Sequence, residues 1–439
     1  MTGARRRSGP AAGPLTRVAA RLTTPTAYLG VLGGLQVLVL WMLRGHFGWW
    51  LPLSVTVAYV ALLALVVRVA GHWRLKLWCV GSLGVLVAIG PTLTGIVQRP
   101  RMGLTMEHDG LLQVESAIDR LLAGRPIYGV DWSSTPMASF PWDLTPGGNP
   151  ALHHMAYYPL TVLVGVPFRL VTGALGLPFD YRIVLIAFAC LGLGAIAALP
   201  VHAERRVMLL TAVYLSPLIT LYLWAGRNDI EFLAVVLLSL ALLTRGHPTL
   251  AAAALGVAAA LKPFAWVAVP FLLLVLYLRW RDSRSIREVL LSVAALAIVP
   301  VATVAPFVLA DPSAFWTDTV LYAAGGIPDA YPIAGYGFGE FLFQTHLVAH
   351  RTDAFPFGVF QLAAMIPVLW IGARAFLRWP TAARWMAGYS ALLLAFTFFA
   401  RFFNDNYLAV VITLLLCIRP LGDRSLAPAG SDQADRLAA

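Results

Sequence analysis

Acidic and histidine side chains gather in one stretch of this 439-residue chain, between residues 99 and 158. In its densest part, Glu107, His108 and Asp109 precede a glycine and an amphipathic run that predicts a helix. A carboxylate so close behind an apolar run lies near the lipid headgroups, where a low dielectric can raise its pKa and suit it to general-base catalysis. Asp109 is the catalytic candidate, and Glu107 is the alternative or supporting acid. The competing interpretations are a solvated loop face for these acids and a helix-capping role for Asp109.

Three isolated cations are candidates to bind a phosphate: Lys262, Arg227 and Arg401. Lys262 lies within an apolar stretch, where a lysine costs about 2.5–3.5 kcal/mol on insertion scales, so an anionic partner is expected. Arg227 precedes Asn228 and Asp229 at the start of a predicted span, where an N-cap or a salt bridge is the competing interpretation. Arg401 follows a span and is expected to face outside, against the positive-inside trend, which favours a lipid phosphate as its partner.

The composition requires a membrane. Hydrophobic residues make up 59% of the chain and charged residues 12%, against roughly 45–50% and 25% in ordinary globular proteins. The net charge of +11 comes from basic residues at the ends of apolar runs, so it indicates membrane orientation and not nucleic-acid binding. Only two of the 32 basic residues are lysines, a bias typical of the GC-rich genomes of actinobacteria. These features predict an all-α polytopic membrane protein with a bundle of about 11–13 transmembrane helices.

A helix needs roughly 20 apolar residues to cross a bilayer. Ten apolar runs are candidates for such spans: 28–43, 51–70, 75–97, 183–200, 207–224, 230–244, 289–310, 356–376, 381–400 and 407–418. The predicted location is the bacterial plasma membrane. The N-terminus is expected on the cytoplasmic side because of Arg5, Arg6 and Arg7, and the later arginines place two larger loops, 99–158 and 311–355, at the outer face. The predicted organisation is a basic cytoplasmic segment 1–27, one transmembrane domain 28–420 and a disordered cytoplasmic tail 421–439.

Two regions interrupt this pattern. Residues 159–178 contain internal prolines and glycines, and Arg205 and Arg206 face the cytoplasm only if this stretch does not cross the membrane. It is expected to dip in and return, or to lie at the outer interface, and to border a cleft. The stretch 250–278 is split by Lys262 and Pro263, so two short arms should go up and come back with Lys262 near the turn.

The sequence gives little indication of a metal site or a cofactor-binding site. A metal site of His108, His153 and His154 is a weak interpretation, because adjacent histidines do not face one ion from a helix and there is no HxxxH pattern. The three cysteines lie within apolar runs, which argues against a disulfide framework or a zinc site. Because no glycine-rich nucleotide loop is present, ATP is not expected either.

Several short phrases occur in an order that resembles the GT-C class of membrane glycosyltransferases, and glycosyltransferase family 87 in particular, the actinobacterial mannosyl- and arabinofuranosyltransferases. They are DG at 109–110, GRPIY at 124–128, AYYPL at 156–160, VPF at 166–168, GRND at 226–229, GVAAALKP at 256–263 and DPSAF at 311–315. The resemblance implies an inverting enzyme whose catalytic aspartate lies in the first outer loop, which corresponds to Asp109. This chain departs from the family in having three spans before the acid, where one is usual.

The resulting hypothesis is sugar transfer from a polyprenyl-phosphate donor to a cell-envelope glycolipid or glycan at the outer face. The sugar would be mannose or, alternatively, arabinofuranose. Lys262, Arg401 and Arg227 would bind the donor phosphate, no cofactor or metal would be required, and the partners would be the two substrates and membrane lipids. The expected substrate groove contains Tyr158, Asn228, Asp229, His153 and His154. The rival function is a transporter or flippase for a lipid-linked or anionic substrate, which also uses broken spans and intramembrane charge.

Overall fold

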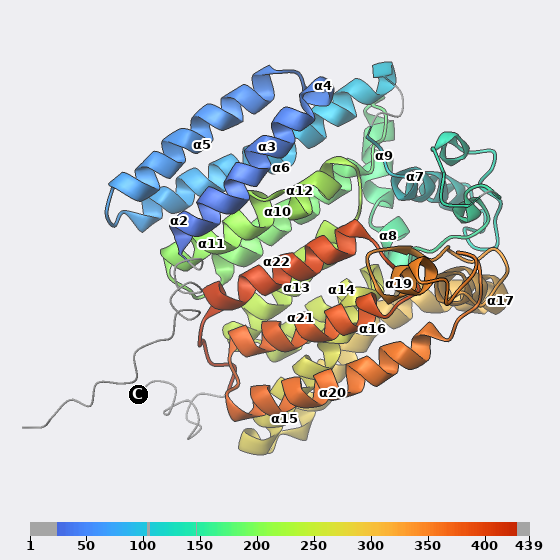
Figure 1. Ribbon diagram of the computed structural model, residues 1–439. Coiled ribbons are helices and arrows are strands. Elements are labelled where there is room, and N and C mark those ends of the chain that lie inside the picture. Colours follow the sequence, from blue (N-terminus) through green and yellow to red (C-terminus); the bar gives the residue numbers. More distant parts are fainter. Residues whose placement is uncertain (1–23, 103–105, 146, 428–439) are drawn as a thin grey trace, which may run out of the picture.

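Long apolar helices lie side by side in the computed structural model, which describes residues 24–102, 106–145 and 147–427 (Figure 1). The shorter helices α7, α8, α9, α17 and α19 gather at one end of this bundle, which we call the loop end. The bundle of apolar helices confirms the predicted all-α polytopic membrane fold. The segments Arg5–Arg7 and 428–439 lie outside the described residues.

The first helices form one edge of the bundle. They are α2 (Pro25–Tyr28), η1 (Leu29–Gly33), α3 (Gly34–Met42), α4 (Arg44–Phe47), α5 (Trp50–Arg68) and α6 (Trp73–Met102). Helix α6 has 30 residues, which at about 1.5 Å per residue is longer than the roughly 30 Å hydrocarbon core. Its last turns therefore reach past the apolar layer and carry Arg99 to the loop end, where Arg99 pairs with Glu115 of α7 (Asp109–Leu122).

The central helices are α10 (Arg182–Ala198), α11 (Ala203–Tyr214), α12 (Pro217–Trp224), α13 (Asp229–Thr244), α14 (Pro248–Leu261), η4 (Pro263–Ala268), α15 (Val269–Ser283) and α16 (Ile286–Ala310). The break at Lys262 is where the sequence predicts it. Because the residue before a proline avoids the helical region, Lys262 is extended (φ −152°, ψ 138°) and α14 ends at Leu261. The two arms around Lys262 are α14 and α15.

The C-terminal helices are α20 (Phe357–Arg378), α21 (Ala382–Phe398) and α22 (Asp405–Leu421). The predicted disordered tail begins too early, since residues 421–427 pack against the start of α21. The Leu426 amide donates to the Pro380 carbonyl at 2.7 Å, Ser425 forms a β-bridge with Thr381, and Leu426 is buried. These backbone hydrogen bonds and the burial of Leu426 fix the segment, although Asp423, Arg424 and Ser425 within it are polar.

Six helices of the described residues are long and apolar enough to cross a membrane: 25–42, 50–68, 73–101, 263–283, 286–310 and 357–378. A seventh is present if α11 and α12, bent by 42° at their junction, form one span. The predicted spans 183–200, 230–244, 381–400 and 407–418 coincide with α10, α13, α21 and α22. These helices have 16–17 residues each and so are shorter than the roughly 20 residues of a full crossing. The chain is a multi-pass membrane protein.

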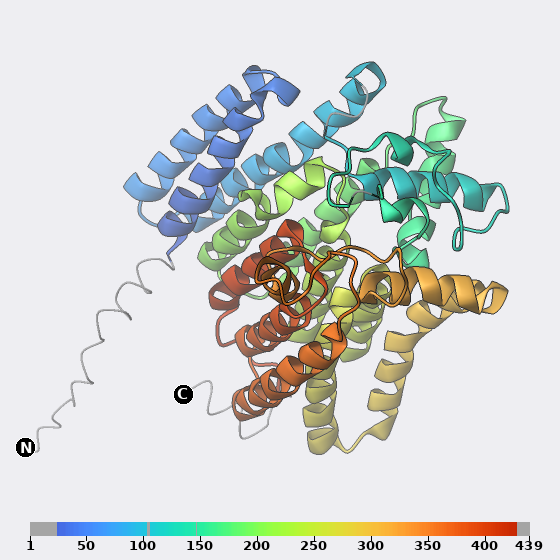
Figure 2. The ribbon, with the colours of Figure 1, turned by 45° about the vertical axis from the view of Figure 1, so that its right-hand side comes forward.

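The irregular stretch 159–178 forms α8 (Pro159–Leu163) and α9 (Val166–Ala174). Both helices are short and lie at the loop end beside α7, and they do not run the length of the bundle (Figures 1 and 2). This arrangement agrees with the prediction that the stretch does not cross. That it borders a cleft stays a prediction, because the residues that line the cavity described below include Tyr158 but none of residues 159–178.

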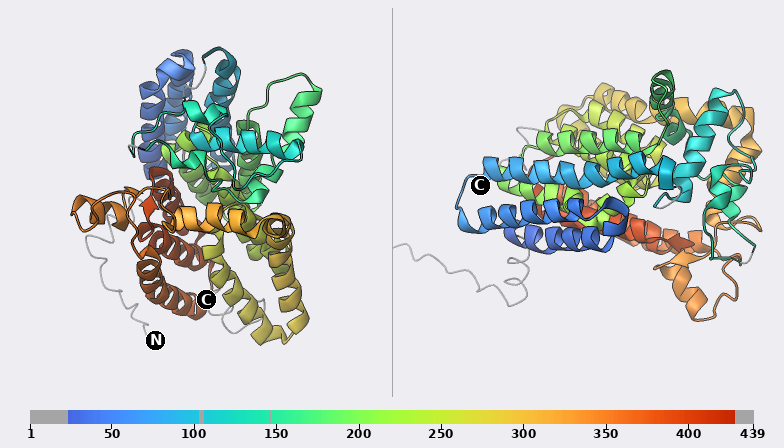
Figure 3. Two further views of the ribbon diagram at one scale, coloured as in Figure 1. Left: turned by 90° about the vertical axis from the view of Figure 1, so that its right-hand side faces the viewer. Right: turned by 90° about the horizontal axis from the view of Figure 1, so that it is seen from above.

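Two loop segments, far apart in sequence, lie side by side at the loop end (Figure 3, left). The first holds α7, η2 (Pro136–Ser139) and η3 (Pro150–Leu152), and the second holds α17 (Pro312–Trp316), η5 (Thr317–Leu321), α18 (Tyr322–Ala324), β1 (Ala334–Gly335) and α19 (Phe338–Gln344). Strand β1 pairs in parallel with β2 (Phe402–Phe403), in the register Ala334 to Phe402. This pairing ties the second segment to the connection between α21 and α22.

Candidate active site

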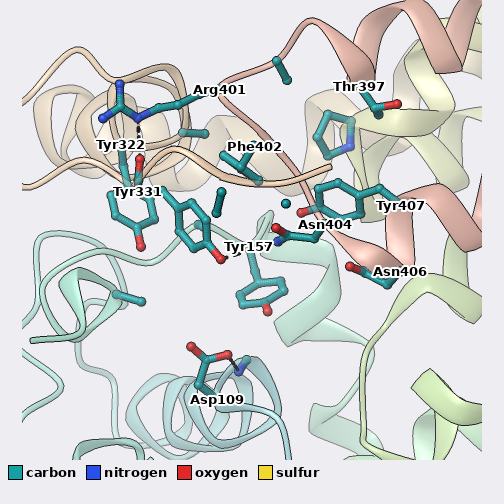
Figure 4. A pocket seen from close by; sticks show the side chains of 18 of the residues that line it. Asp109, Tyr157, Tyr322, Tyr331, Thr397, Arg401, Phe402, Asn404, Asn406 and Tyr407 are labelled. Atoms are coloured by element: carbon teal, nitrogen blue, oxygen red, sulfur yellow. Dashed lines mark hydrogen bonds between the residues drawn. The ribbon is translucent and has the colours of Figure 1, made fainter. Parts of the chain in front are cut away.

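A cavity of about 940 Å³ opens at the loop end between the two loop segments and the ends of the bundle helices (Figure 4). This volume is at the upper end of the roughly 300–1,000 Å³ typical of ligand pockets. Of the predicted site residues it is lined by Asp109, Tyr158, Arg227, Asn228, Lys262 and Arg401. Glu107, His153, His154 and Asp229 are not among its lining residues.

Asp109 is the first residue of α7 and is buried, with its carboxylate at the cavity wall. Its Oδ1 accepts the Gly110 amide at 2.7 Å and lies 2.8 Å from Nδ1 of His108, while Oδ2 accepts from Asn149 at 3.3 Å. Burial alone raises the pKa of this carboxyl, but the charge of His108 and these hydrogen bonds outweigh it and lower the pKa of Asp109 to about 2. The direction expected from the sequence is therefore wrong. Asp109 is ionised at neutral pH and can accept a proton.

The start of α7 is held by close backbone packing. The His108 amide donates to the Ala225 carbonyl at 2.9 Å, and the His108 side chain occupies the N-cap position that the competing interpretation gave to Asp109. A side chain at Gly110 would overlap the hydroxyl of Tyr157, and one at Gly226, whose φ is +81°, would collide with Leu111. Gly226 therefore lets the 225–228 turn approach α7, and Gly110 lets Tyr157 approach the start of the same helix.

Lys262 lies at the break between α14 and η4. Its Nζ is 2.6 Å from Oδ1 of Asp229 and 3.3 Å from Oδ1 of Asn228, and it lies over the Tyr407 ring, 5.4 Å from the centroid. The anionic partner that the sequence predicts for Lys262 is therefore the carboxylate of Asp229. Asp229 is fully buried behind Lys262, and it also accepts a hydrogen bond from Asn406 at 2.7 Å.

Arg227 reaches the same cavity from the turn before α13. Its guanidinium donates to Asp405 at 2.6 Å and to Asn406 at 2.9 Å and lies over the ring of Tyr222. Since Asn406 also donates to Asp229, Arg227 and Lys262 are joined through one polar floor. Each cation has a protein acid as partner, so the floor is close to neutral before any ligand binds.

Arg401 lines the cavity, at the far side from Asp109 in Figure 4. Its guanidinium is buried and donates to the backbone carbonyls of Tyr331, Asp353 and Arg351. These hydrogen bonds fix the second loop segment on the connection between α21 and α22. Its predicted contact with a lipid phosphate stays a prediction.

Glu107 is buried outside the cavity and pairs with Arg182, the first residue of α10, at 3.1 Å. Arg182 also contacts Asp180 at 2.7 Å, and Asp180 contacts Arg99 at 2.9 Å. Although Glu107 is only two positions before Asp109 in the sequence, it belongs to an ion-pair network that joins α6 and α10 and not to the cavity.

The two histidines of the predicted groove also lie off the cavity. His153 is half exposed and lies 3.7 Å from Asp131. His154 is buried between the two loop segments, with Nδ1 2.8 Å from Asp318 and Nε2 2.8 Å from Asp329. Each of the three candidate metal histidines thus contacts a different acid, and no group of three or more His, Cys, Asp or Glu side chains in the described part of the chain is placed to hold a metal ion.

The His154 pairing predicts a pH-dependent stability. Burial lowers the pKa of His154, but the hydrogen bonds and charges of Asp318 and Asp329 raise it above its usual value. The stabilisation is therefore complete below the unfolded pKa of about 6.5 and is lost as the pH rises through the raised folded pKa. In detergent, we expect the thermal unfolding midpoint of the wild type to exceed that of His154→Gln at pH 6, with a gap that narrows at alkaline pH. A gap that stays constant with pH would contradict the pairing.

The sequence argument missed several residues that line the cavity: Tyr157, Tyr322, Tyr331, Asn404, Asp405, Asn406 and Tyr407. The run FFNDNY at 402–407 was visible beside Arg401 and holds three polar side chains at the predicted start of a span. Tyr322 and Tyr331, from the second loop segment, carried no local signal, because tyrosines near span ends are ordinary in membrane proteins.

Comparison with known proteins identifies the family. The model of glycosyltransferase family 87 matches residues 156–430, which is more than half of the chain. The chain belongs to glycosyltransferase family 87. The match includes Arg227, Lys262 and the 402–407 run, whereas Asp109 precedes it. No curated protein sequence matches the chain.

One solved structure resembles this family 87 chain, that of ArnT from Cupriavidus metallidurans bound to undecaprenyl phosphate. The two chains are 17% identical, with a TM-score of 0.44 over 80% of this chain and 60% of ArnT. The family 87 chain thus spans about 60% of the length of ArnT.

Proposed function

We propose that this family 87 protein transfers a sugar from a polyprenyl-phosphate donor to a glycolipid or glycan of the cell envelope. The observation that carries the proposal is that an ionised aspartate, Asp109, and the cations Lys262 and Arg227 line one cavity at the end of a membrane bundle. The proposed sugar is mannose, with arabinofuranose as the alternative, and the proposed location of the site is the outer face of the bacterial plasma membrane.

The proposed reaction is a single displacement that inverts the anomeric carbon. Asp109 accepts the proton of the acceptor hydroxyl, and the acceptor oxygen bonds to the anomeric carbon. The bond from that carbon to the phosphate oxygen breaks, and its electron pair leaves with the polyprenyl phosphate. The energy comes from the sugar–phosphate bond, so this step needs no nucleotide.

The phosphate is assigned to the polar floor. Lys262 and Arg227 can stabilise charge that develops on the leaving phosphate, and fixed cations in a site with little water act strongly in this way. Asn228 and Tyr158 complete the wall beside them. Because Arg401 is engaged with main-chain carbonyls, we assign it the role of positioning the loop and not of binding phosphate.

The polyprenyl chain is assigned to the lipid-facing side of the cavity. Phe357, Gly358 and Gln361 of α20 line the cavity, and Val359 and Leu362 on the same helix are largely exposed. An apolar helix with so little of its surface covered by protein is expected to face lipid. The donor headgroup could therefore enter the cavity while its chain stays among lipids.

Membrane vesicles that contain the protein and radiolabelled polyprenyl-phosphate mannose would test this proposal. We expect label to move into a new glycolipid or glycan, and a parallel reaction with the arabinofuranosyl donor distinguishes the two sugars. Label that crosses the bilayer still attached to polyprenyl phosphate would indicate a transporter and would overturn the proposal.

Substitution of Lys262 separates binding of phosphate from pairing with Asp229. We expect Lys262→Gln to raise the KM for donor by about tenfold, equivalent to about 1.4 kcal/mol of binding, and to destabilise the fold because Asp229 is left buried and unpaired. The double variant Lys262→Gln/Asp229→Asn removes both charges and should regain stability while its donor KM stays high. A wild-type donor KM in the double variant would show that Lys262 only neutralises Asp229.

A further inference from the structure

The histidine beside the catalytic aspartate has contacts that its N-cap position does not explain. Nδ1 of His108 is 2.8 Å from Oδ1 of Asp109 and 3.1 Å from the Gly110 amide nitrogen. The same amide is 2.7 Å from Oδ1 of Asp109. One N–H group therefore lies between two acceptor atoms that are themselves within hydrogen-bond distance of each other.

This geometry satisfies two protonation states of His108. When Nδ1 has no proton, it accepts from the Gly110 amide, which is shared with Asp109. When Nδ1 is protonated, it donates to Asp109 Oδ1, and the Gly110 amide bonds to the carboxylate alone. The Gly110 N–H has an acceptor in both states, and the 2.8 Å separation of Nδ1 and Oδ1 is a hydrogen-bond distance once a proton lies between them.

His108 also has an exit for a proton. It lines both the main cavity and a second cavity of about 340 Å³. About 28% of its side chain is exposed, against 12% for Asp109. His108 shares these two cavities with the charged side chains of Asp109, Glu107, Arg227 and Asp143. Glu107 is paired with Arg182, and the Phe140 ring lies 6.0 Å from the ring of His108.

We propose that His108 takes over the proton that Asp109 removes from the acceptor hydroxyl. The proton leaves the acceptor oxygen as that oxygen bonds to the anomeric carbon, binds the carboxylate of Asp109 and passes to Nδ1 of His108. Asp109 is then ionised again, and the imidazolium releases one proton to water at the second cavity. His108 acts through Asp109 and need not touch either substrate. This inference rests on the proposed function.

The charge of a protonated His108 is one of the causes that lower the pKa of Asp109. This cause is absent when His108 is neutral, which is the state that can take up the proton. Asp109 is therefore the stronger base towards the acceptor hydroxyl in that state.

The variant His108→Gln tests the relay, because an amide can hydrogen-bond Gly110 and Asp109 but cannot hold the proton. In purified protein reconstituted in lipid, we expect kcat to fall by about 10² with the donor KM nearly unchanged. The control is His350→Gln, since His350 is exposed at the same end of the molecule and does not line the cavity.

Added imidazole gives a second readout that a purely structural role would not affect. We expect imidazole to restore part of the activity of His108→Ala, with recovery that increases with pH as more of the added base is neutral, and to leave Asp109→Asn inactive. The relay is overturned if His108→Gln keeps the wild-type rate, or if imidazole has no effect on a folded His108→Ala. Absence of transfer by the wild type would instead refute the proposed function.

Discussion

Replacement of Asp109 by asparagine should abolish sugar transfer while the protein still folds and binds donor. General acid–base groups contribute about 10²–10⁴ in rate, so kcat should fall by at least about 10² and the donor KM should change little, as expected when an interaction made only in the transition state is lost. The fold should survive because the side-chain amide of asparagine keeps an oxygen that can accept the Gly110 amide. The measurement is transfer from radiolabelled donor by equal amounts of reconstituted wild type and variant.

The matched control for this prediction is Asp131→Asn. Asp131 lies in the same loop segment, is 66% exposed at its side chain and caps a turn through the Ser133 amide, away from the cavity. Its variant should retain wild-type activity. Equal transfer by Asp109→Asn would remove the base assignment and direct attention to Asp405, a half-exposed acid of the cavity floor.

Replacement of Arg182 by methionine should cause the largest loss of stability. The guanidinium is 1% exposed and donates to both oxygens of Asp180, to Glu107 and to the Trp224 carbonyl. Methionine is of similar length but leaves two buried carboxylates without this partner. Breaking a buried ion pair in this way costs about 3–5 kcal/mol. We expect a marked fall in the thermal unfolding midpoint in detergent.

An exposed ion pair on the same face of the molecule provides the comparison. Arg169 of α9 contacts Asp119 of α7 at 2.8 Å, with side chains 35% and 58% exposed. Such pairs contribute about 0–1 kcal/mol, so Arg169→Met should be nearly neutral. If both variants lowered the midpoint equally, the loss would come from general disturbance of the loop end and not from stranded charge.

The helical path could be predicted because its signals are local. Apolar runs gave the positions of the bundle helices, and Lys262–Pro263 gave the break between α14 and α15, since proline restricts the residue before it. The arginine pattern correctly implied that residues 159–178 do not run through the bundle. The number of full crossings was harder to judge, because helices of 14–17 residues are intermediate between a span and a buried core helix.

The contacts of individual charges could not be predicted in the same way. Arg401, Lys262 and Arg227 looked alike in sequence as isolated cations. In the structure one donates to three backbone carbonyls, one to a buried aspartate and one to Asp405. Hydropathy shows that a charge is expensive at a given depth, but it does not show which group will compensate it.

The sequence by itself determined that this chain is a helical membrane protein, where its helices break and that acids and cations would meet near one end. These properties follow from residue type and short-range backbone geometry. Only the tertiary structure decided that Asp109 joins the cavity while Glu107 joins Arg182, and that His154 bridges two loop segments through Asp318 and Asp329. The reason is that electrostatic pairing depends on distance and burial, and both are set by packing between segments that lie far apart in the sequence.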